Sequence, residues 1–151
     1  MQIPLLLEEK LQVRITDLNI GHHLANDAIL GFLHQGRVRL LNEGGWNEAD
    51  VGGVGLIMRR SEVDYLAEAF LFDRLQLNVG LAMTGRARCR FHYRLIRCSD
   101  DAEKAIATAV TEMAFFDYAR RRVARAPVLF TEWVDRINSV AVSASRGMLT
   151  S

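Results

Sequence analysis

The sequence predicts an α+β fold in which one antiparallel sheet of about five strands wraps around a single long helix. An apolar stripe with helical spacing lies in the N-terminal third of the chain, and long segments of alternating apolar and polar residues follow it. Short turns containing Gly or Asp separate these later segments, which is typical of antiparallel strands. The stripe needs a partner surface, and the later strands provide one.

The first expected element is a strand at residues 12–16, where apolar and polar residues alternate. A polar loop follows it. The helix is expected over residues 25–41, because apolar residues recur there at steps of three and four. Each Gly inside a helix costs about 1 kcal/mol relative to Ala. We therefore expect Gly31 and Gly36 to be present for close packing.

A loop rich in Gly, Asn and Asp is expected at residues 42–55, and strands are expected beyond it. The turns between these strands are short, so the sequence predicts a meander. A short terminal helix is expected after Pro127, with one face formed by Leu129, Trp133, Ile137 and Val140. We expect residues 1–142 to form one domain and residues 143–151 to be a frayed tail. The expected strands are 55–65, 74–84, 86–96 and 105–116.

The composition is that of one globular domain: 151 residues, of which 50% are hydrophobic and 25% are charged. These values exclude a disordered chain. The net charge of +1 argues against a protein that coats nucleic acid. Residues 1–75 nevertheless carry a charge of −4 and residues 76–151 a charge of +5. Most of the basic residues are Arg, which binds phosphate and carboxylate groups well, so an anionic ligand is expected.

Nothing in the sequence indicates a membrane or metal protein. No segment approaches the ~20 apolar residues that span a bilayer. The first ten residues include Glu8 and Glu9, so no signal peptide is expected. Cys89 and Cys98 lie an odd number of residues apart and lack a CxxC pair, so neither a disulfide nor a metal site is expected. We expect a cytoplasmic protein without a metal.

The candidate chemistry lies just before the predicted helix, in a segment dense in side chains that bind or move protons. A helix N-terminus presents free N–H groups that suit a developing oxyanion. The alternative is that Asn26 or Asp27 only caps the helix and that the histidines are ordinary loop residues. The segment contains Asp17, Asn19, His22, His23, Asn26 and Asp27.

Residues 17–26 resemble the signature loop of the hot-dog-fold thioesterases, which reads D-x-D-x-x-x-H-x-N-N before the central helix. Residues 30–37 are similar to the helix of that family, which commonly ends in E-x-A-R. Residues 65–75 resemble its Y-x-x-P-A-x-x-G-D-x-L segment. The resemblance covers most of residues 11–118. It implies a hot-dog fold and hydrolysis of an acyl-CoA or an acyl-carrier-protein thioester.

Position by position, the resemblance places Asp17 at the first acidic position, His23 at the motif histidine and Asn26 at the start of the helix. Asn19 departs from the pattern, because many relatives carry their catalytic carboxylate there and an amide cannot act as a base. Our catalytic hypothesis is that Asp17 or neutral His23 activates water. Asn19 and Asn26 would then position the water or the thioester carbonyl. His34 and Gln35 also depart, since the helix of the family often carries Glu there.

Substrate binding is expected from Arg86 and Arg88, which begin an alternating run that continues with Arg90 and Arg94. These guanidinium groups would hold the phosphates of coenzyme A or the arm of a carrier protein. The alternative is an ordinary solvated face of the sheet. Tyr65 is a candidate for shaping the acyl pocket. The resemblance implies a homodimer or homotetramer with shared sites, no cofactor apart from the coenzyme A of the substrate, and no nucleic-acid or membrane partner.

Two other interpretations remain open. Because Asn19 replaces a carboxylate, the same fold can serve a non-hydrolytic acyl-CoA binding protein or a dehydratase. The other interpretation is a nucleic-acid binder that uses the arginine-rich strand. It predicts salt-sensitive binding to any polyanion.

Overall fold

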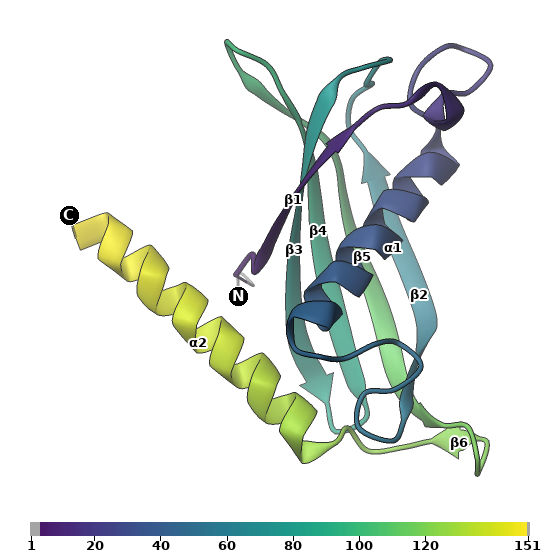
Figure 1. Ribbon diagram of the computed structural model, residues 1–151, viewed down its shortest axis with the longest axis vertical. Coiled ribbons are helices and arrows are strands. Elements are labelled where there is room, and N and C mark those ends of the chain that lie inside the picture. The colour runs from purple at the N-terminus through teal and green to yellow at the C-terminus, as the bar shows by residue number, and fades with distance from the viewer. Residues whose placement is uncertain (1–3, 151) are drawn as a thin grey trace.

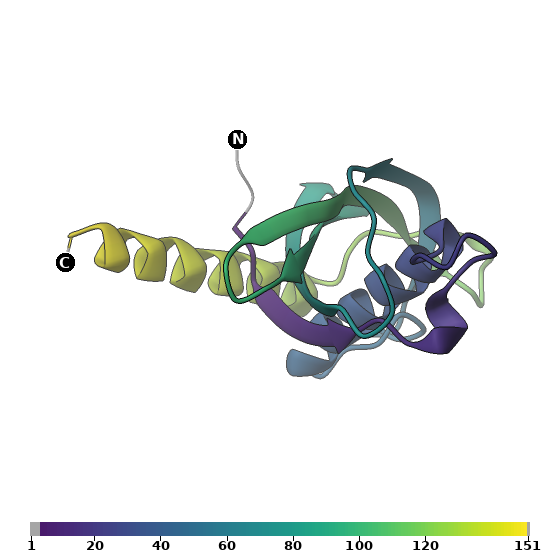
Figure 2. The ribbon, with the colours of Figure 1, turned by 90° about the horizontal axis from the view of Figure 1, so that it is seen from above.

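The computed structural model describes residues 4–150 and shows one curved antiparallel sheet around a helix. The strand order is β1-β3-β4-β5-β2, with the short β6 paired to β5. Figure 1 shows α1 running along the sheet, and Figure 2 shows the sheet curving around it. The predicted fold class is confirmed. The strands are β1 (Leu7–Gln12), β2 (Gly55–Tyr65), β3 (Arg74–Gly85), β4 (Arg88–Cys98), β5 (Glu103–Asp117) and β6 (Arg122–Val123); the helices are α1 (Asn26–Glu43) and α2 (Val128–Thr150).

Helix α1 and the four long strands lie close to their predicted positions, but the strands are not a simple meander. Strands β3, β4 and β5 are consecutive neighbours, whereas β2 pairs with β5 at the far edge. Residues 66–73 carry the chain from the end of β2 to the start of β3. This crossing segment is held by backbone hydrogen bonds, including Phe72 N–H to Val13 at 2.9 Å and Leu66 N–H to Ile106 at 2.8 Å. It therefore lies against the loop that precedes α1.

The first strand was predicted in the wrong place. It spans Leu7–Gln12 and pairs with β3, while Ile15–Asp17 form a turn of 3₁₀ helix. The physical reason is the Asp17 carboxylate, which accepts a hydrogen bond from the Arg14 backbone N–H at 2.9 Å and bends the chain. Val13 is buried but Ile15 is exposed, so the two do not share a sheet face.

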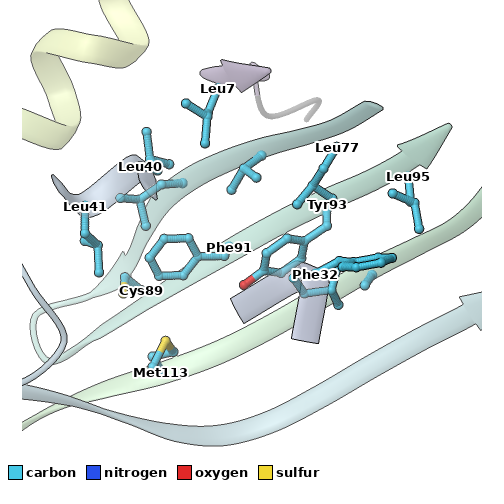
Figure 3. Close-up of a cluster of buried hydrophobic side chains, with 14 of the residues drawn as sticks. Leu7, Phe32, Leu40, Leu41, Leu77, Cys89, Phe91, Tyr93, Leu95 and Met113 are labelled. Carbon is cyan, nitrogen blue, oxygen red and sulfur yellow. The ribbon is translucent and has the colours of Figure 1, made fainter. Parts of the chain in front are cut away.

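The core lies between α1 and the concave face of the sheet. Figure 3 shows Phe32 and Leu40 of α1 pointing toward Phe91 and Tyr93 of β4. The two helix glycines differ. A Cβ on Gly36 would lie 2.5 Å from Leu77 and 2.9 Å from Val79, so the expectation of close packing is confirmed there. A Cβ on Gly31 would meet nothing within 4 Å, so close packing does not explain that residue.

Helix α2 is much longer than predicted. It runs to Thr150 and so includes most of the segment expected to be frayed; Ser151 lies outside the described residues. The buried residues Phe130, Trp133 and Val134 pack its first turns against the body. Leu129 and Val140, expected on the packed face, are exposed. Beyond this attachment the helix projects away from the sheet (Figure 1), and no proline interrupts its hydrogen bonds.

Candidate functional site

A surface groove lies where the loop before α1 meets the crossing segment 66–73. Its volume is ≈ 370 Å³. Four of the predicted site residues meet in this groove although they are far apart in the sequence: Asn19, His23, Asn26 and Tyr65. The fold thus brings together the motif loop, the start of the helix and the end of β2. The lining is completed by Leu24, Ile29, Leu66, Ala67, Glu68 and Ile106.

The loop before α1 is closed by its own backbone and by the Asn19 side chain. Leu18 and Leu24 form an antiparallel bridge, and the His22 N–H donates to the Asn19 carbonyl at 3.0 Å. The Asn19 Oδ1 accepts hydrogen bonds from the backbone N–H groups of Gly21 at 3.0 Å and His23 at 3.4 Å. An amide oxygen at this position therefore shapes the loop, which places the His23 side chain at the groove.

The His23 imidazole has close neighbours on three sides. Its Nε2 lies 3.6 Å from Oε1 of Glu68, and its ring meets the Phe70 ring edge-on with centroids 6.4 Å apart. On the third side is Gly21, where a Cβ would lie only 2.9 Å from Nε2. The side chain is 33% exposed, so it remains open to a ligand. We call Asn19, His23 and Glu68 the groove cluster.

Asp17 is not a member of the groove cluster. It is buried, and it lines an adjoining hollow of ≈ 900 Å³ between β1 and α1, which shares Asn19 with the groove. Its two carboxylate oxygens accept hydrogen bonds from the Arg14 guanidinium at 3.2 Å and from the Arg14 N–H at 2.9 Å. Burial alone would raise the pKa of Asp17, but these hydrogen bonds outweigh it and hold the pKa below its ordinary value. A carboxylate bound in this way is a weak base.

The N-terminus of α1 leaves its first N–H groups free of side-chain caps. The capping residue is Ala25, and among the described residues no side chain accepts a hydrogen bond from the first N–H groups of the helix. The interpretation that Asn26 or Asp27 serves only as a cap is therefore not supported. The Tyr65 hydroxyl lies 3.5 Å from the Asn26 carbonyl oxygen. The positive end of the helix dipole is available at the groove.

Arg86 and Arg88 lie at the other end of the molecule. Arg86 lies in the turn between β3 and β4 and Arg88 is the first residue of β4, whereas the groove lies near the start of β3. A strand rises about 3.3 Å per residue, so β3 separates them from the groove by roughly 35 Å. A single chain does not bring these arginines to the reaction loop. Further along β4, Arg90 is paired with Glu112 at 2.6 Å, so the arginine run is not an unbroken cationic strip.

A second polar group lies beneath the middle of α1, and we call it the buried cluster: Arg37, Glu48, Tyr93 and Thr111. Arg37 is 7% exposed. Its Nε donates to Glu48, and its Nη1 donates to the Tyr93 hydroxyl at 3.1 Å. The Tyr93 hydroxyl also lies 2.7 Å from the Thr111 hydroxyl, and burial raises the pKa of Tyr93. Every member of the buried cluster has a partner.

The cysteines are both free, and Cys89 is not placed for chemistry. Cys89 is buried beside the core, and burial raises the pKa of its thiol to about 12, which keeps it protonated and inert. Within residues 4–150, no three His, Cys, Asp or Glu side chains lie close enough together to hold a metal ion. Over the same part of the chain, no helix is long and apolar enough to cross a membrane.

Sequence reasoning did not identify Glu68 or Arg14 as neighbours of the motif loop. Glu68 did leave a signal, because it stands at the proline position of the Y-x-x-P pattern that residues 65–75 resemble. For Arg14 the only sequence signal is its position three residues before Asp17, and this spacing also occurs on strands and loops. Its contact with Asp17 depends on the 3₁₀ turn, which the sequence did not predict.

Comparison with known proteins agrees with this architecture. Residues 13–136 match the family model described as the thioesterase-like superfamily. No curated protein matches the chain by sequence.

Solved structures share the fold at low sequence identity. A hypothetical protein from Staphylococcus aureus in complex with CoA is 16% identical, with a TM-score of 0.79 over 92% of this chain and 87% of that one. A 1,4-dihydroxy-2-naphthoyl-CoA thioesterase from Synechocystis is 18% identical, with a TM-score of 0.75 over 84% and 93%. A probable thioesterase from Escherichia coli is 15% identical, with a TM-score of 0.71 over 87% and 98%.

Proposed function

The chain belongs to the thioesterase-like superfamily, and on that premise we propose that it hydrolyses an acyl thioester to a carboxylic acid and a thiol. The observation that carries the proposal is the groove, where His23, Asn19, Asn26 and Tyr65 meet at the uncapped N-terminus of α1. A titratable side chain beside free N–H groups is the arrangement that acyl transfer to water requires.

Each element of the groove has a role in the proposed reaction. The N–H groups of the first turn of α1 stabilise the negative charge that develops on the thioester oxygen. The His23 imidazole lies beside the attacking water. Asn19 keeps the loop in the shape that presents His23, because its Oδ1 already accepts two backbone hydrogen bonds. Asp17 takes no part, since Arg14 occupies both of its oxygens.

We propose coenzyme A as the carrier of the acyl group. The Staphylococcus aureus structure was solved in complex with CoA, and the Synechocystis protein is named for a CoA ester. The arginine-rich end of this chain offers guanidinium groups suited to phosphates, among them Arg86 and Arg88. A carrier-protein thioester has the same reacting group and is the alternative substrate.

We propose that two copies pair along β2, because this strand is a free edge of the sheet with one neighbour. Antiparallel pairing would place the arginine-rich end of each chain toward the groove of the other. Pairing centred on Ser61 would set Arg60 opposite Glu62 of the partner subunit, an attractive cross-strand pair. Light scattering tests this: a dimer or tetramer is expected, and a strict monomer contradicts the pairing.

Thiol release from a panel of acyl-CoA thioesters tests the proposed activity. We expect turnover by the native protein and a loss of about 100-fold or more in kcat for His23→Gln, because the imidazole leaves the groove. Arg39→Gln is the matched control, since the exposed Arg39 side chain lies near the C-terminal end of α1, away from the groove. Release of no thiol from any thioester would refute the proposal.

A non-hydrolytic acyl-CoA binding protein is the second candidate. It is favoured by one observation, that neither motif position 17 nor position 19 offers a free carboxylate. Tight binding of acyl-CoA without release of thiol would support it over hydrolysis.

A further inference from the structure

The proposed hydrolysis needs a group that takes a proton from water, and the acidic side chains at this end of the molecule are mostly occupied. Asp17 is bound by Arg14. The Asp73 Oδ2 accepts the Phe70 N–H at 2.8 Å and lies 4.0 Å from Arg97. Asp27 does not line the groove; it lines the adjoining hollow beside β1, on the other side of Asn19. Among the described residues that line the groove, Glu68 is the one carboxylate.

We infer that Glu68 is the general base of this site and supplies the carboxylate that position 19 lacks; this inference rests on the proposed thioester hydrolysis. The Glu68 side chain is 62% exposed, so one or both oxygens can reach a water in the groove. Its Oε1 lies 3.6 Å from the His23 Nε2, so the carboxylate and the imidazole face each other across the groove. Asn19 and Glu68 line the same groove from different segments of the chain.

The backbone around Glu68 is anchored on both sides, which keeps this exposed side chain at the groove. The Glu68 carbonyl accepts a hydrogen bond from Arg97 at 3.1 Å, and the Ala69 carbonyl accepts one from the Leu24 N–H at 2.8 Å. Phe70 forms an antiparallel bridge with His23. These bonds tie the Glu68 segment directly to the motif loop, so the two cannot separate without breaking them. Catalytic groups need such supporting contacts to hold a productive geometry.

The chemical step is balanced without any further reactant. The water oxygen bonds to the thioester carbon while Glu68 takes one water proton. The carbon–sulfur bond then breaks, its electron pair leaves on sulfur, and the proton passes from Glu68 to the thiolate. The N–H groups at the start of α1 stabilise the oxyanion between the two events.

The test compares Glu68→Gln with Glu103→Gln, which removes a negative charge from an exposed residue at the same end of the sheet. For Glu68→Gln we expect kcat to fall by about 100-fold or more while KM changes by less than about threefold. Tm should remain within about 1 °C of the native value, because the side chain is exposed. Glu103→Gln should match the native protein, and Glu68→Asp should recover part of the lost kcat.

A second experiment moves the carboxylate to position 19 and so distinguishes a catalytic role of Glu68 from a structural one. Asn19→Asp in the Glu68→Gln background returns a carboxylate to the groove and keeps an oxygen that accepts the two loop hydrogen bonds. Recovery of at least tenfold in kcat supports the inference. If the native protein hydrolyses thioesters and Glu68→Gln does so at the rate of Glu103→Gln, the inference is wrong and the function stands. If the native protein hydrolyses none, the proposed function fails and the inference fails with it.

Discussion

The groove cluster and the buried cluster both lie against α1, yet their polar groups are satisfied to very different degrees. In the buried cluster, Arg37 donates to both Glu48 and Tyr93, and Tyr93 is bonded in turn to Thr111. In the groove cluster, the His23 imidazole faces Glu68 at 3.6 Å, beyond hydrogen-bond distance, and both side chains are open to solvent.

This difference in hydrogen bonding indicates that the buried cluster serves stability and the groove cluster serves function. A buried charge without a partner is costly, so the buried cluster is complete and contributes to holding α1 on the sheet. Exposed groups can leave a hydrogen bond unmade at little cost, and an unmade bond is what a substrate or water can accept or donate. We therefore expect substitutions in the buried cluster to change unfolding and those in the groove cluster to change catalysis.

The largest expected effect is on unfolding. Arg37→Met should lower the free energy of unfolding by about 3 kcal/mol, because it removes the cation from a buried pair and takes one hydrogen-bond donor from Glu48 and one from Tyr93. Urea denaturation at fixed protein concentration measures this. Arg39→Met, two residues along α1 but 60% exposed, should change stability by less than about 1 kcal/mol. Equal losses in the two variants would contradict the comparison.

A smaller effect is expected from moving the His23 ring without changing its chemistry. Gly21→Ala would place a Cβ 2.9 Å from the His23 Nε2, so the ring must shift. We expect thioester turnover to fall about tenfold, because small displacements of a reacting group reduce rates strongly. Gly85→Ala is the control, since a Cβ there meets nothing within 4 Å. Native-like kcat in Gly21→Ala would show that the ring position does not matter.

The smallest expected effect is a pH-dependent change in stability at Asp17, which lies outside the groove cluster. The pKa of Asp17 is lowered in the folded protein, so its contribution to stability is present above the unfolded value of about 3.9 and is lost as pH falls through the folded value. Asp17→Asn should cost about 1 kcal/mol at pH 7 and progressively less below about pH 4. Denaturation curves at several pH values test this, and a difference that stays constant down to pH 2 would contradict it.

Most of the fold could be predicted from the sequence, because the signals for its long elements are local. The alternation along residues 74–84 predicts β3 almost to its ends, and the strand predicted at 55–65 coincides with β2. The first strand was misplaced because the bend at Arg14 and Asp17 comes from a side-chain contact, which alternation does not reveal. The length of α2 was underestimated because the apolar spacing that predicted it ends at Val140, whereas the helix runs to Thr150.

The sequence by itself determined the fold class and the motif loop, since periodicity and the spacing of Asn19, His23 and Asn26 are properties of neighbouring residues. Only the tertiary structure decided which side chains meet. The crossing segment brings Glu68 to His23 across 45 positions of sequence, the 3₁₀ turn removes Asp17 from the groove, and the length of β3 places Arg86 and Arg88 at the far end. The physical reason is that contacts between distant segments depend on strand order and register. Both are set only when all the strands of the sheet have paired.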